Sequence, residues 1–445
     1  MLLKYVVSNY KSIGHSIEFS MIPTENCTDE RFLTSINTKQ GILKILKRGG
    51  FFGPNASGKS NFIESIKFAK DYIIEGKRSN KSTGVPQYKG NIPELDNTTL
   101  FQFLFYLDEN IYEYGFSLTS KRVVEEWLMI QTEDGFAQMF VRSTDVNSKT
   151  EIDIAPNFIN STSEEKELAT VLKNSIKESQ RNQLFLYKLK ENGVEFAEKI
   201  VGWFEGIQII FPRSKIKWLP IRVNEDDELK EFLSESLRNL DTGVFSIKAE
   251  KNEVNFHEFA EKLELSKETI EEIENNKSGI ISFSGKYYIF FEKDEKTVLI
   301  KLRFEHKLSN NSANFDIDDE SDGTKRLLDL LPILFRMDKK NTTIYLVDEI
   351  DRSLHTKLSM YLLKTFMEKS EGLLNQFIFT AHDVNLINLN DFAQEEIWFI
   401  EKDNLGETSL KPFSDFETNG QQDIVKDYLN GRFGAIPVIR GERRW

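Results

Sequence analysis

Apolar and polar residues alternate along three stretches of the chain, which is the pattern of strands with one buried face. Residues 2–22 alternate around a break at 12–14 and predict two antiparallel strands joined by a turn. Between 99 and 142, short runs rich in Phe, Tyr, Val and Ile are separated by polar turns and predict an antiparallel sheet. Residues 280–304 predict further strands.

Other stretches repeat apolar residues at helical spacing. One predicted helix opens at Ser161–Glu164, which has the form of a capping box. Acidic residues at 225–228 suit the positive N-terminal end of another helix. No heptad pattern is sustained, which argues against a long coiled-coil arm. The predicted helices cover about residues 60–75, 161–176, 194–204, 225–240 and 256–275.

Two runs, 344–347 and 376–381, are apolar throughout, as expected for strands buried on both faces of a parallel sheet. Together with the helices they predict an α/β fold: a mixed sheet flanked by helices, an antiparallel β subdomain and an inserted α+β region. We expect an N-terminal lobe at 1–160, a helical and mixed insertion at 161–305, and a C-terminal lobe at 306–445.

Residues 53–60 fit the G-x-x-x-x-G-K-[ST] phosphate loop. Its glycines let backbone N–H groups turn toward phosphate oxygens, and the helix that follows adds the positive end of its dipole. Lys59 would reach the β- and γ-phosphates, and the Ser60 hydroxyl would coordinate Mg²⁺. A glycine-rich turn could carry the same letters, but the apolar run before it and the helical pattern after it favour nucleotide binding. The predicted contact residues are Gly53, Pro54, Asn55, Ala56, Ser57, Gly58, Lys59, Ser60 and Asn61.

Two carboxylates, Asp348 and Glu349, follow the apolar run at 344–347. In a phosphate-loop protein this is the Walker B position, at the carboxyl edge of the sheet. Asp348 would hold Mg²⁺ through water, and Glu349 would polarise the attacking water as general base. A strand that merely ends in solvated acids is the alternative, and the phosphate loop upstream weighs against it.

A serine and a histidine complete the set of candidate residues. Ser321 opens a helix with Asp322, Gly323 and Thr324, so its hydroxyl and the free N–H groups could bind an anion, although a plain N-cap would look similar. His382 follows the apolar run at 376–381. A lone histidine at a strand end is usually structural.

Composition narrows the class of protein. The net charge of -13 argues against a protein wrapped in nucleic acid over most of its surface and leaves only a local basic patch. The single cysteine, Cys27, cannot form an internal disulfide and suggests a reducing compartment. The first ten residues turn polar too soon for a signal peptide, and no apolar run reaches membrane length. We therefore expect a cytoplasmic protein without a membrane partner.

Two other kinds of site are disfavoured. His15, His257, His306 and His355 have no partners at metal-ligand spacing, so a zinc site is not predicted. The acidic run 316–320 resembles the D-x-D motif of a nuclease. No apolar strand leads into this run, so we expect a solvated loop.

In chain order, the phosphate loop, the Ser321 segment, the acidic pair and His382 resemble the ABC-type ATPase heads of the SMC, RecF and recombination-repair group. This resemblance implies a P-loop NTPase head that uses ATP and Mg²⁺. It also implies that Ser321 to Thr324 form a signature that meets the γ-phosphate of a second copy, and that His382 is the switch histidine. Asn9–Ser12 resembles the strand end that those heads place near the nucleotide.

A closer resemblance is to bacterial AAA15/AAA21 or OLD-like ATPases, and among them to the RloA/AbiLi type. The shared features are 320–324, Asp348–Asp351, 353–355 and 428–437. The resemblance implies ATP-driven pairing into a homodimer or higher oligomer. It also implies a place in phage defence beside a separately encoded effector, such as an RloB-type protein or another nuclease. The Q-loop glutamine remains open between Gln183, Gln180 and Gln87.

The competing hypothesis is a RecF-like repair ATPase that clamps DNA, with nucleic acid as its partner. It needs a basic groove, whose candidates are Arg213, Lys215, Lys217, Arg440, Arg443 and Arg444. A transporter subunit is weaker, because no Leu-Ser-Gly-Gly-Gln signature occurs.

Overall fold

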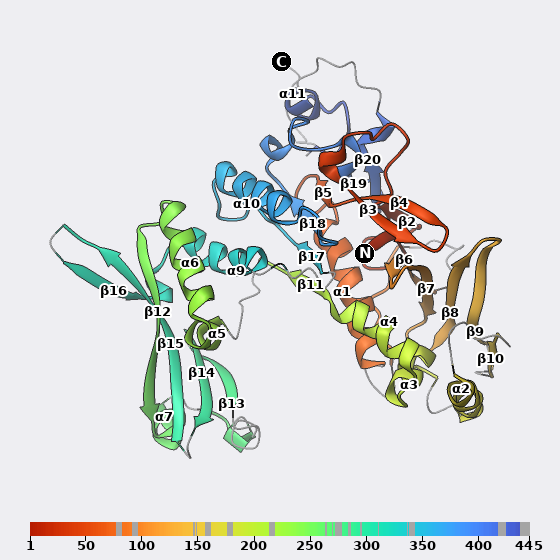
Figure 1. Cartoon of the computed structure of the whole chain (residues 1–445), viewed down its shortest axis with the longest axis horizontal. Coiled ribbons are helices and arrows are strands. Elements are labelled where there is room, and N and C mark those ends of the chain that lie inside the picture. The colour runs from red at the N-terminus through yellow and green to blue at the C-terminus, as the bar shows by residue number, and fades with distance from the viewer. Residues whose placement is uncertain are drawn as a thin grey trace. The chain divides into compact units, whose positions relative to one another are not determined.

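The structure is a computed structural model of the 445-residue chain. Contacts divide it into two compact units (Figure 1). The first comprises Met1–Phe211, Met337–Asp351 and Ser359–Trp445, and the second Pro212–Arg336 and Arg352–Leu358. The described residues are 1–76, 82–90, 97–145, 147, 149–155, 162–175, 181–212, 219–262, 265–268, 270–271, 278–283, 286–293, 296–309, 311–335, 337, 343–416 and 424–436.

This division differs from the three segments expected from the sequence. Helices α3 (Phe185–Glu191) and α4 (Glu195–Glu205) fall in the first unit, because both pack against α1 (Lys59–Glu75). The boundary of the second unit therefore lies near Pro212 rather than near residue 161.

The first unit contains an antiparallel sheet in the order β10-β9-β8-β7-β6-β1-β2. Every neighbouring pair is antiparallel, as the alternation at 2–22 and 99–142 predicts. A separate hairpin joins β3 (Leu33–Thr38) to β4 (Gly41–Leu46). The sheet strands are β1 (Leu2–Ser8), β2 (Ile17–Ser20), β6 (Thr99–Leu107), β7 (Asn110–Leu118), β8 (Val123–Thr132), β9 (Gly135–Thr144) and β10 (Thr150–Ile154).

A second sheet of this unit has the order β11-β17-β18-β5-β19-β20. All its neighbours run parallel except β19 and β20, so the α/β prediction is confirmed. The carboxyl ends of β5, β17 and β18 therefore meet at one edge, where ligands bind in such sheets. The strands are β11 (Ile207–Ile210), β17 (Ile344–Val347), β18 (Gln376–Ala381), β5 (Arg48–Phe52), β19 (Ile397–Lys402) and β20 (Thr408–Pro412).

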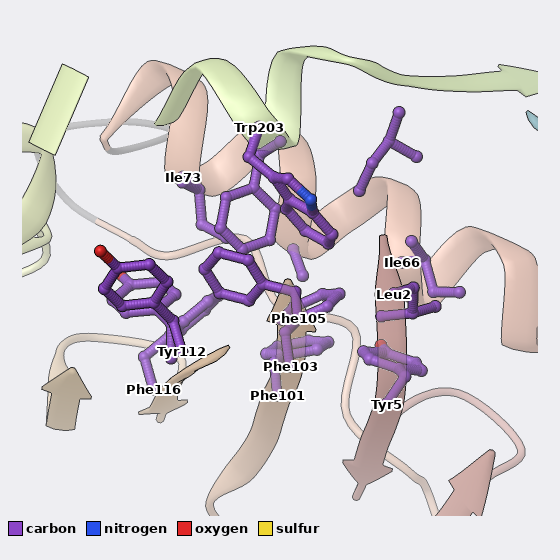
Figure 2. Packing of buried hydrophobic residues seen from close by; sticks show 14 of the residues in the cluster. Leu2, Tyr5, Ile66, Ile73, Phe101, Phe103, Phe105, Tyr112, Phe116 and Trp203 are labelled. Atoms are coloured by element: carbon purple, nitrogen blue, oxygen red, sulfur yellow. The ribbon is translucent and has the colours of Figure 1, made fainter. Parts of the chain in front are cut away.

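An aromatic core lies behind the phosphate-loop helix. Figure 2 shows Phe105 of β6 beside Trp203 of α4, with Phe101 and Phe103 on the same strand. The rings of Phe105 and Trp203 stack with centroids 4.3 Å apart. Burial of large aromatic side chains is the main source of stability in such a core. Helix α1 is thus held on a rigid support.

One predicted helix needs correction, and another is described only in part. The capping box of α2 (Ser163–Ser175) begins one residue later than predicted, since Thr162 and Glu165 exchange hydrogen bonds of 3.0 and 3.1 Å. Ser and Thr stand side by side there, as do two Glu, so spacing alone leaves the register open. The helix expected at 256–275 is described as α7 (Phe256–Lys262), and residues 263–264, 269 and 272–277 lie outside the described residues.

The second unit is built on a five-stranded antiparallel sheet. Helices α5 (Leu219–Glu225) and α6 (Asp227–Asn239) pack on it, and α6 contacts α9 (Asp322–Leu334). The strands predicted at 280–304 and the acidic start of α6 are confirmed. The strands are β12 (Val244–Val254), β13 (Ser278–Phe283), β14 (Lys286–Lys293), β15 (Lys296–Lys307) and β16 (Ser312–Asp316).

Candidate nucleotide-binding site

The phosphate loop connects β5 to α1 and depends on two close backbone approaches. A Cβ at Gly53 would lie 2.1 Å from the carbonyl oxygen of Ile400, and one at Gly58 would lie 2.2 Å from Thr408 Oγ1. Gly58 also has φ 112°, a conformation that favours glycine. Both glycines of the motif are therefore required by geometry.

Ser57 and Lys59 show how the loop could receive phosphate. Ser57 is 2 % exposed, and its hydroxyl has no hydrogen-bond partner within the described part of the chain. Lys59 Nζ donates to the carbonyl oxygens of Gly53 at 2.5 Å and Pro54 at 2.9 Å. Burial lowers the pKa of Lys59 to about 8, against the opposing charge of nearby carboxylates. A bound phosphate would satisfy the Ser57 hydroxyl and favour the charged ammonium, so these residues fit a nucleotide.

The acidic pair lies at the end of β17, beside the phosphate-loop helix. Asp348 Oδ1 accepts from Thr380 Oγ1 at 2.6 Å, and a hydrogen bond also joins Asp348 to Ser60. Burial raises the pKa of Asp348, while the two hydroxyls act in the opposite direction. The two predicted Mg²⁺ ligands, Ser60 and Asp348, are therefore in contact and supply the oxygen donors that this ion prefers.

Glu349, His382 and Lys59 converge at the same edge. His382 Nε2 lies 3.6 Å from Glu349 Oε1, and His382 Nδ1 lies 3.4 Å from Lys59 Nζ. The Glu349 side chain is 26 % exposed, so solvent water can reach it. Its backbone has φ 49°, an unfavourable conformation that costs about 1–3 kcal/mol and is often found at functional sites. A carboxylate, an imidazole and an ammonium group thus lie in a row, each within hydrogen-bonding or ion-pair distance of the next.

Asp351 and Thr380 support this cluster, a role that the sequence predicted for neither residue. Asp351 Oδ2 accepts the N–H groups of His382 at 2.8 Å and Asp383 at 2.6 Å, which fixes the start of the segment that follows β18. Thr380 Oγ1 accepts the Glu349 N–H at 2.8 Å while it donates to Asp348. The sequence offers one signal for Thr380, because its hydroxyl stands alone among the apolar residues of the run 376–381.

Thr408 of β20 braces the phosphate loop from outside. Its hydroxyl donates to the carbonyl oxygen of Ser57 at 2.9 Å and lies 2.8 Å from Ser12 Oγ. Asn61 Nδ2 donates to the same Ser12 oxygen at 2.6 Å. The segment Asn9–Ser12 therefore lies beside the loop, as the resemblance implies. Nothing in the sequence around Thr408 indicates this role.

The Q-loop candidates lie at different distances from the phosphate loop. Leu184 N donates to the carbonyl oxygen of Gly76, the residue that ends α1. Because α1 has 17 residues and is about 25 Å long, Gln183 lies at its far end from the loop. Tyr88 N donates to Asn9 Oδ1 at 3.1 Å, which places Gln87 beside the strand end next to the loop. Gln180 lies outside the described residues.

The predicted signature residues lie in the second unit. Ser321 is the N-cap of α9, and its hydroxyl oxygen accepts the Thr324 N–H at 3.1 Å. Ser321 and Asp322 are exposed. A Cβ at Gly323 would lie 2.9 Å from the carbonyl oxygen of Ser353, so the segment after the acidic pair packs closely on this helix start.

The remaining candidates are the acidic run 316–320 and the basic residues named for a DNA groove. The run 316–320 is the end of β16 followed by a 3-10 turn at Ile317–Asp319. Asp318 and Asp319 are exposed, as expected of a solvated segment, whereas Glu320 is buried. Asp316 is held by an ion pair with Arg303. Within the described ranges, no three or more His, Cys, Asp or Glu side chains are grouped so that they could hold a metal ion. All six basic residues named for a DNA groove lie outside the described residues.

Residues 50–388 match the model of the AAA_21 family, whose description is "AAA domain, putative AbiEii toxin, Type IV TA system". The chain belongs to this family. The matched region contains the phosphate loop, Ser321, the acidic pair and His382. No curated protein matches the chain. Among the helices of the described ranges, none has the length and apolar character that a membrane span needs.

The solved structures that match the chain include heads of SMC proteins. The SMC head domain from Thermotoga maritima is 13% identical, with a TM-score of 0.37 over 94% of this chain and 99% of that chain. The Smc head from Pyrococcus furiosus, bound to the C-terminal domain of ScpA, is 14% identical, with a TM-score of 0.38 over 97% of this chain and 99% of that chain.

Proposed function

We propose that this chain is an ATPase whose nucleotide-dependent dimer regulates a separately encoded effector in bacterial antiphage defence. The convergence of Lys59, Glu349 and His382 beside the Ser60–Asp348 contact carries the proposal. The family description names a toxin of a toxin–antitoxin system, which supports a defensive setting. The RloA/AbiLi type, an RloB-type or other nuclease effector and a cytoplasmic location belong to the same proposal.

The residues divide the work of hydrolysis. Ser57 and Lys59 hold the phosphates, and the Glu349 carboxylate takes a proton from the water that attacks the terminal phosphorus. Ser60 and Asp348 would hold Mg²⁺, which neutralises phosphate charge when bound. Thr380 and Asp351 keep Glu349 and His382 in place through the hydrogen bonds to their backbone N–H groups.

The second copy supplies the signature in this proposal. Ser321 is exposed at the start of a 13-residue helix, and its hydroxyl oxygen already accepts the Thr324 N–H. A terminal phosphate would meet this hydroxyl and the first two N–H groups of the helix. Hydrolysis would then require two chains, and the rate per chain would rise with protein concentration.

The test is Glu349→Gln, with Glu368→Gln on α10 (Thr356–Lys369) as a matched surface control. Loss of the general base should slow turnover by roughly 10²–10⁴ while ATP still binds. Steady-state hydrolysis measures turnover, and binding of a fluorescent ATP analogue measures affinity. Gel filtration with ATP measures dimer formation. We expect the variant to accumulate as an ATP-bound dimer. Unchanged turnover would remove Glu349 from its role.

The effector is tested separately. Tagged Glu349→Gln protein, expressed with the products of neighbouring genes, should retain one of them with ATP and release it with ADP. Retention that ignores the nucleotide would contradict regulation by the dimer.

A further inference from the structure

Glu320 is a buried carboxylate directly before the predicted signature serine. It lies between the 3-10 turn at Ile317–Asp319 and the N-cap of α9, and its side chain is 5 % exposed. A buried carboxylate is costly unless a partner satisfies it. The neighbouring Ser321 is exposed, so a fixed anchor and an accessible hydroxyl occupy consecutive positions.

The partner of Glu320 is His306, a residue that the proposed reaction does not use. His306 Nε2 lies 2.7 Å from Glu320 Oε1. His306 is in β15, paired with Val244 of β12 on one side and Ala313 of β16 on the other. Its ring packs edge-on against Phe315, with centroids 5.0 Å apart. The backbone of His306 is therefore fixed between two strands, and its ring contacts a side chain of one of them.

We propose that His306 is a positioning residue that, through Glu320, fixes Ser321 at the start of α9. Consecutive Cα atoms are about 3.8 Å apart, so movement of the anchored Glu320 is passed directly to Ser321. The ligand served is the terminal phosphate of a nucleoside triphosphate held by a second copy of the chain. This inference rests on the proposed function, because it assigns a support to the same shared site.

A purely stabilising role for the pair makes a different prediction. Loss of stability would lower the amount of folded protein, and every activity of the chain would fall together. Loss of positioning would lower kcat only at the composite site to which the altered chain contributes the signature. The phosphate loop of the same chain belongs to the other unit and should keep its affinity for nucleotide.

The experiment compares His306→Leu, His306→Gln and His306→Asn, with His257→Leu as a control histidine in the same unit. We expect His306→Leu to lower kcat by roughly 10- to 100-fold, the scale of a displacement of about 1 Å. The KM for ATP should stay within about twofold, because binding by the phosphate loop is unchanged. The Gln amide can still reach Glu320 and should restore most of kcat, whereas the shorter Asn should not.

Mixed dimers distinguish a loss of positioning from a loss of stability. His306→Leu retains its phosphate loop, and Lys59→Ala retains its signature, so a mixed dimer contains one intact composite site. Half of randomly paired dimers are mixed, each with one of two sites intact, so an equal mixture should reach about one quarter of the wild-type rate. Either protein alone should fall well below that value.

The outcomes separate this inference from the function on which it rests. Wild-type kcat in His306→Leu, or no gain on mixing with Lys59→Ala, would overturn the positioning role. If His306→Leu does not fold, equal rates for the Gln and Asn variants would overturn it instead. A wild-type chain that hydrolyses no ATP would overturn the proposed function itself, and this inference with it.

Discussion

Single hydroxyl groups hold the nucleotide site together at the residue scale. Thr380 joins Asp348 to the backbone of Glu349, and Thr408 joins the phosphate loop to Ser12. Both threonines are buried, so each hydroxyl must satisfy its partners inside the protein. The geometry of the site therefore depends on residues that contact no phosphate.

Thr408→Val removes the hydroxyl and leaves the carbonyl of Ser57 without that donor. A lost hydrogen bond of this kind costs about 0.5–1.5 kcal/mol, so we expect nucleotide affinity to fall roughly 2- to 10-fold. Titration with a fluorescent ATP analogue measures this affinity. Thr408→Ser keeps the hydroxyl and is the matched control. Equal affinities for the Val and Ser variants would show that the brace is not needed.

Cys27 should be an inert thiol. Burial, together with nearby Glu395, raises the pKa of Cys27 to about 12, so at pH 8 almost none of it is thiolate. We expect its reaction with a disulfide reagent at pH 8 to be at least about 100-fold slower in the native chain than in the chain unfolded by guanidinium, where a thiol has its usual pKa. Similar rates in the two states would show that Cys27 is accessible.

At the scale of elements, a buried carboxylate ties helix α3 to the antiparallel sheet. Glu126 of β8 accepts the N–H groups of Phe185 at 2.6 Å and Leu186 at 2.9 Å, at the start of the helix. It also accepts from Tyr114, and Arg142 lies 3.6 Å away. One side chain thus provides the cap for a helix from a distant strand.

Glu126→Ala should destabilise the chain strongly. It leaves Arg142 buried without its counter-charge and the first N–H groups of α3 without an acceptor, which costs about 3–5 kcal/mol. Urea unfolding followed by circular dichroism measures the change. Glu125→Ala, an exposed neighbour, should change stability by less than about 0.5 kcal/mol. Equal midpoints for the two variants would contradict the capping role.

At the scale of the whole molecule, the proposed site needs residues from two chains. Ser321→Arg should abolish hydrolysis and keep nucleotide binding, because it blocks only the signature. Lys59→Ala should lose both hydrolysis and nucleotide binding. Mixed in equal amounts, the two inactive variants should recover about one quarter of the wild-type rate, since half of the dimers are mixed and each has one intact site. Wild-type hydrolysis that persists at a dilution where only monomer remains would contradict shared sites.

Local patterns were sufficient for most elements. The alternation at 2–22 and 99–142 and the apolar runs at 344–347 and 376–381 predict the observed strands, because side-chain burial repeats with the period of the backbone. Where two neighbouring residues could serve equally well, as Ser161 and Thr162 could for the capping box, the sequence left the register open.

The sequence by itself determined the phosphate loop, the acidic pair and their order along the chain, because these depend on local backbone geometry and on residue chemistry at fixed spacing. Only the tertiary structure revealed the braces: Thr408 lies 351 residues from Ser57, and Asp351 lies 31 residues from His382. Such partners are brought together by strand order and chain crossing, and neither leaves a periodic trace in the sequence. For the same reason the sequence did not predict the contact between His306 and Glu320, which depends on the pairing of β15 with β12 and β16.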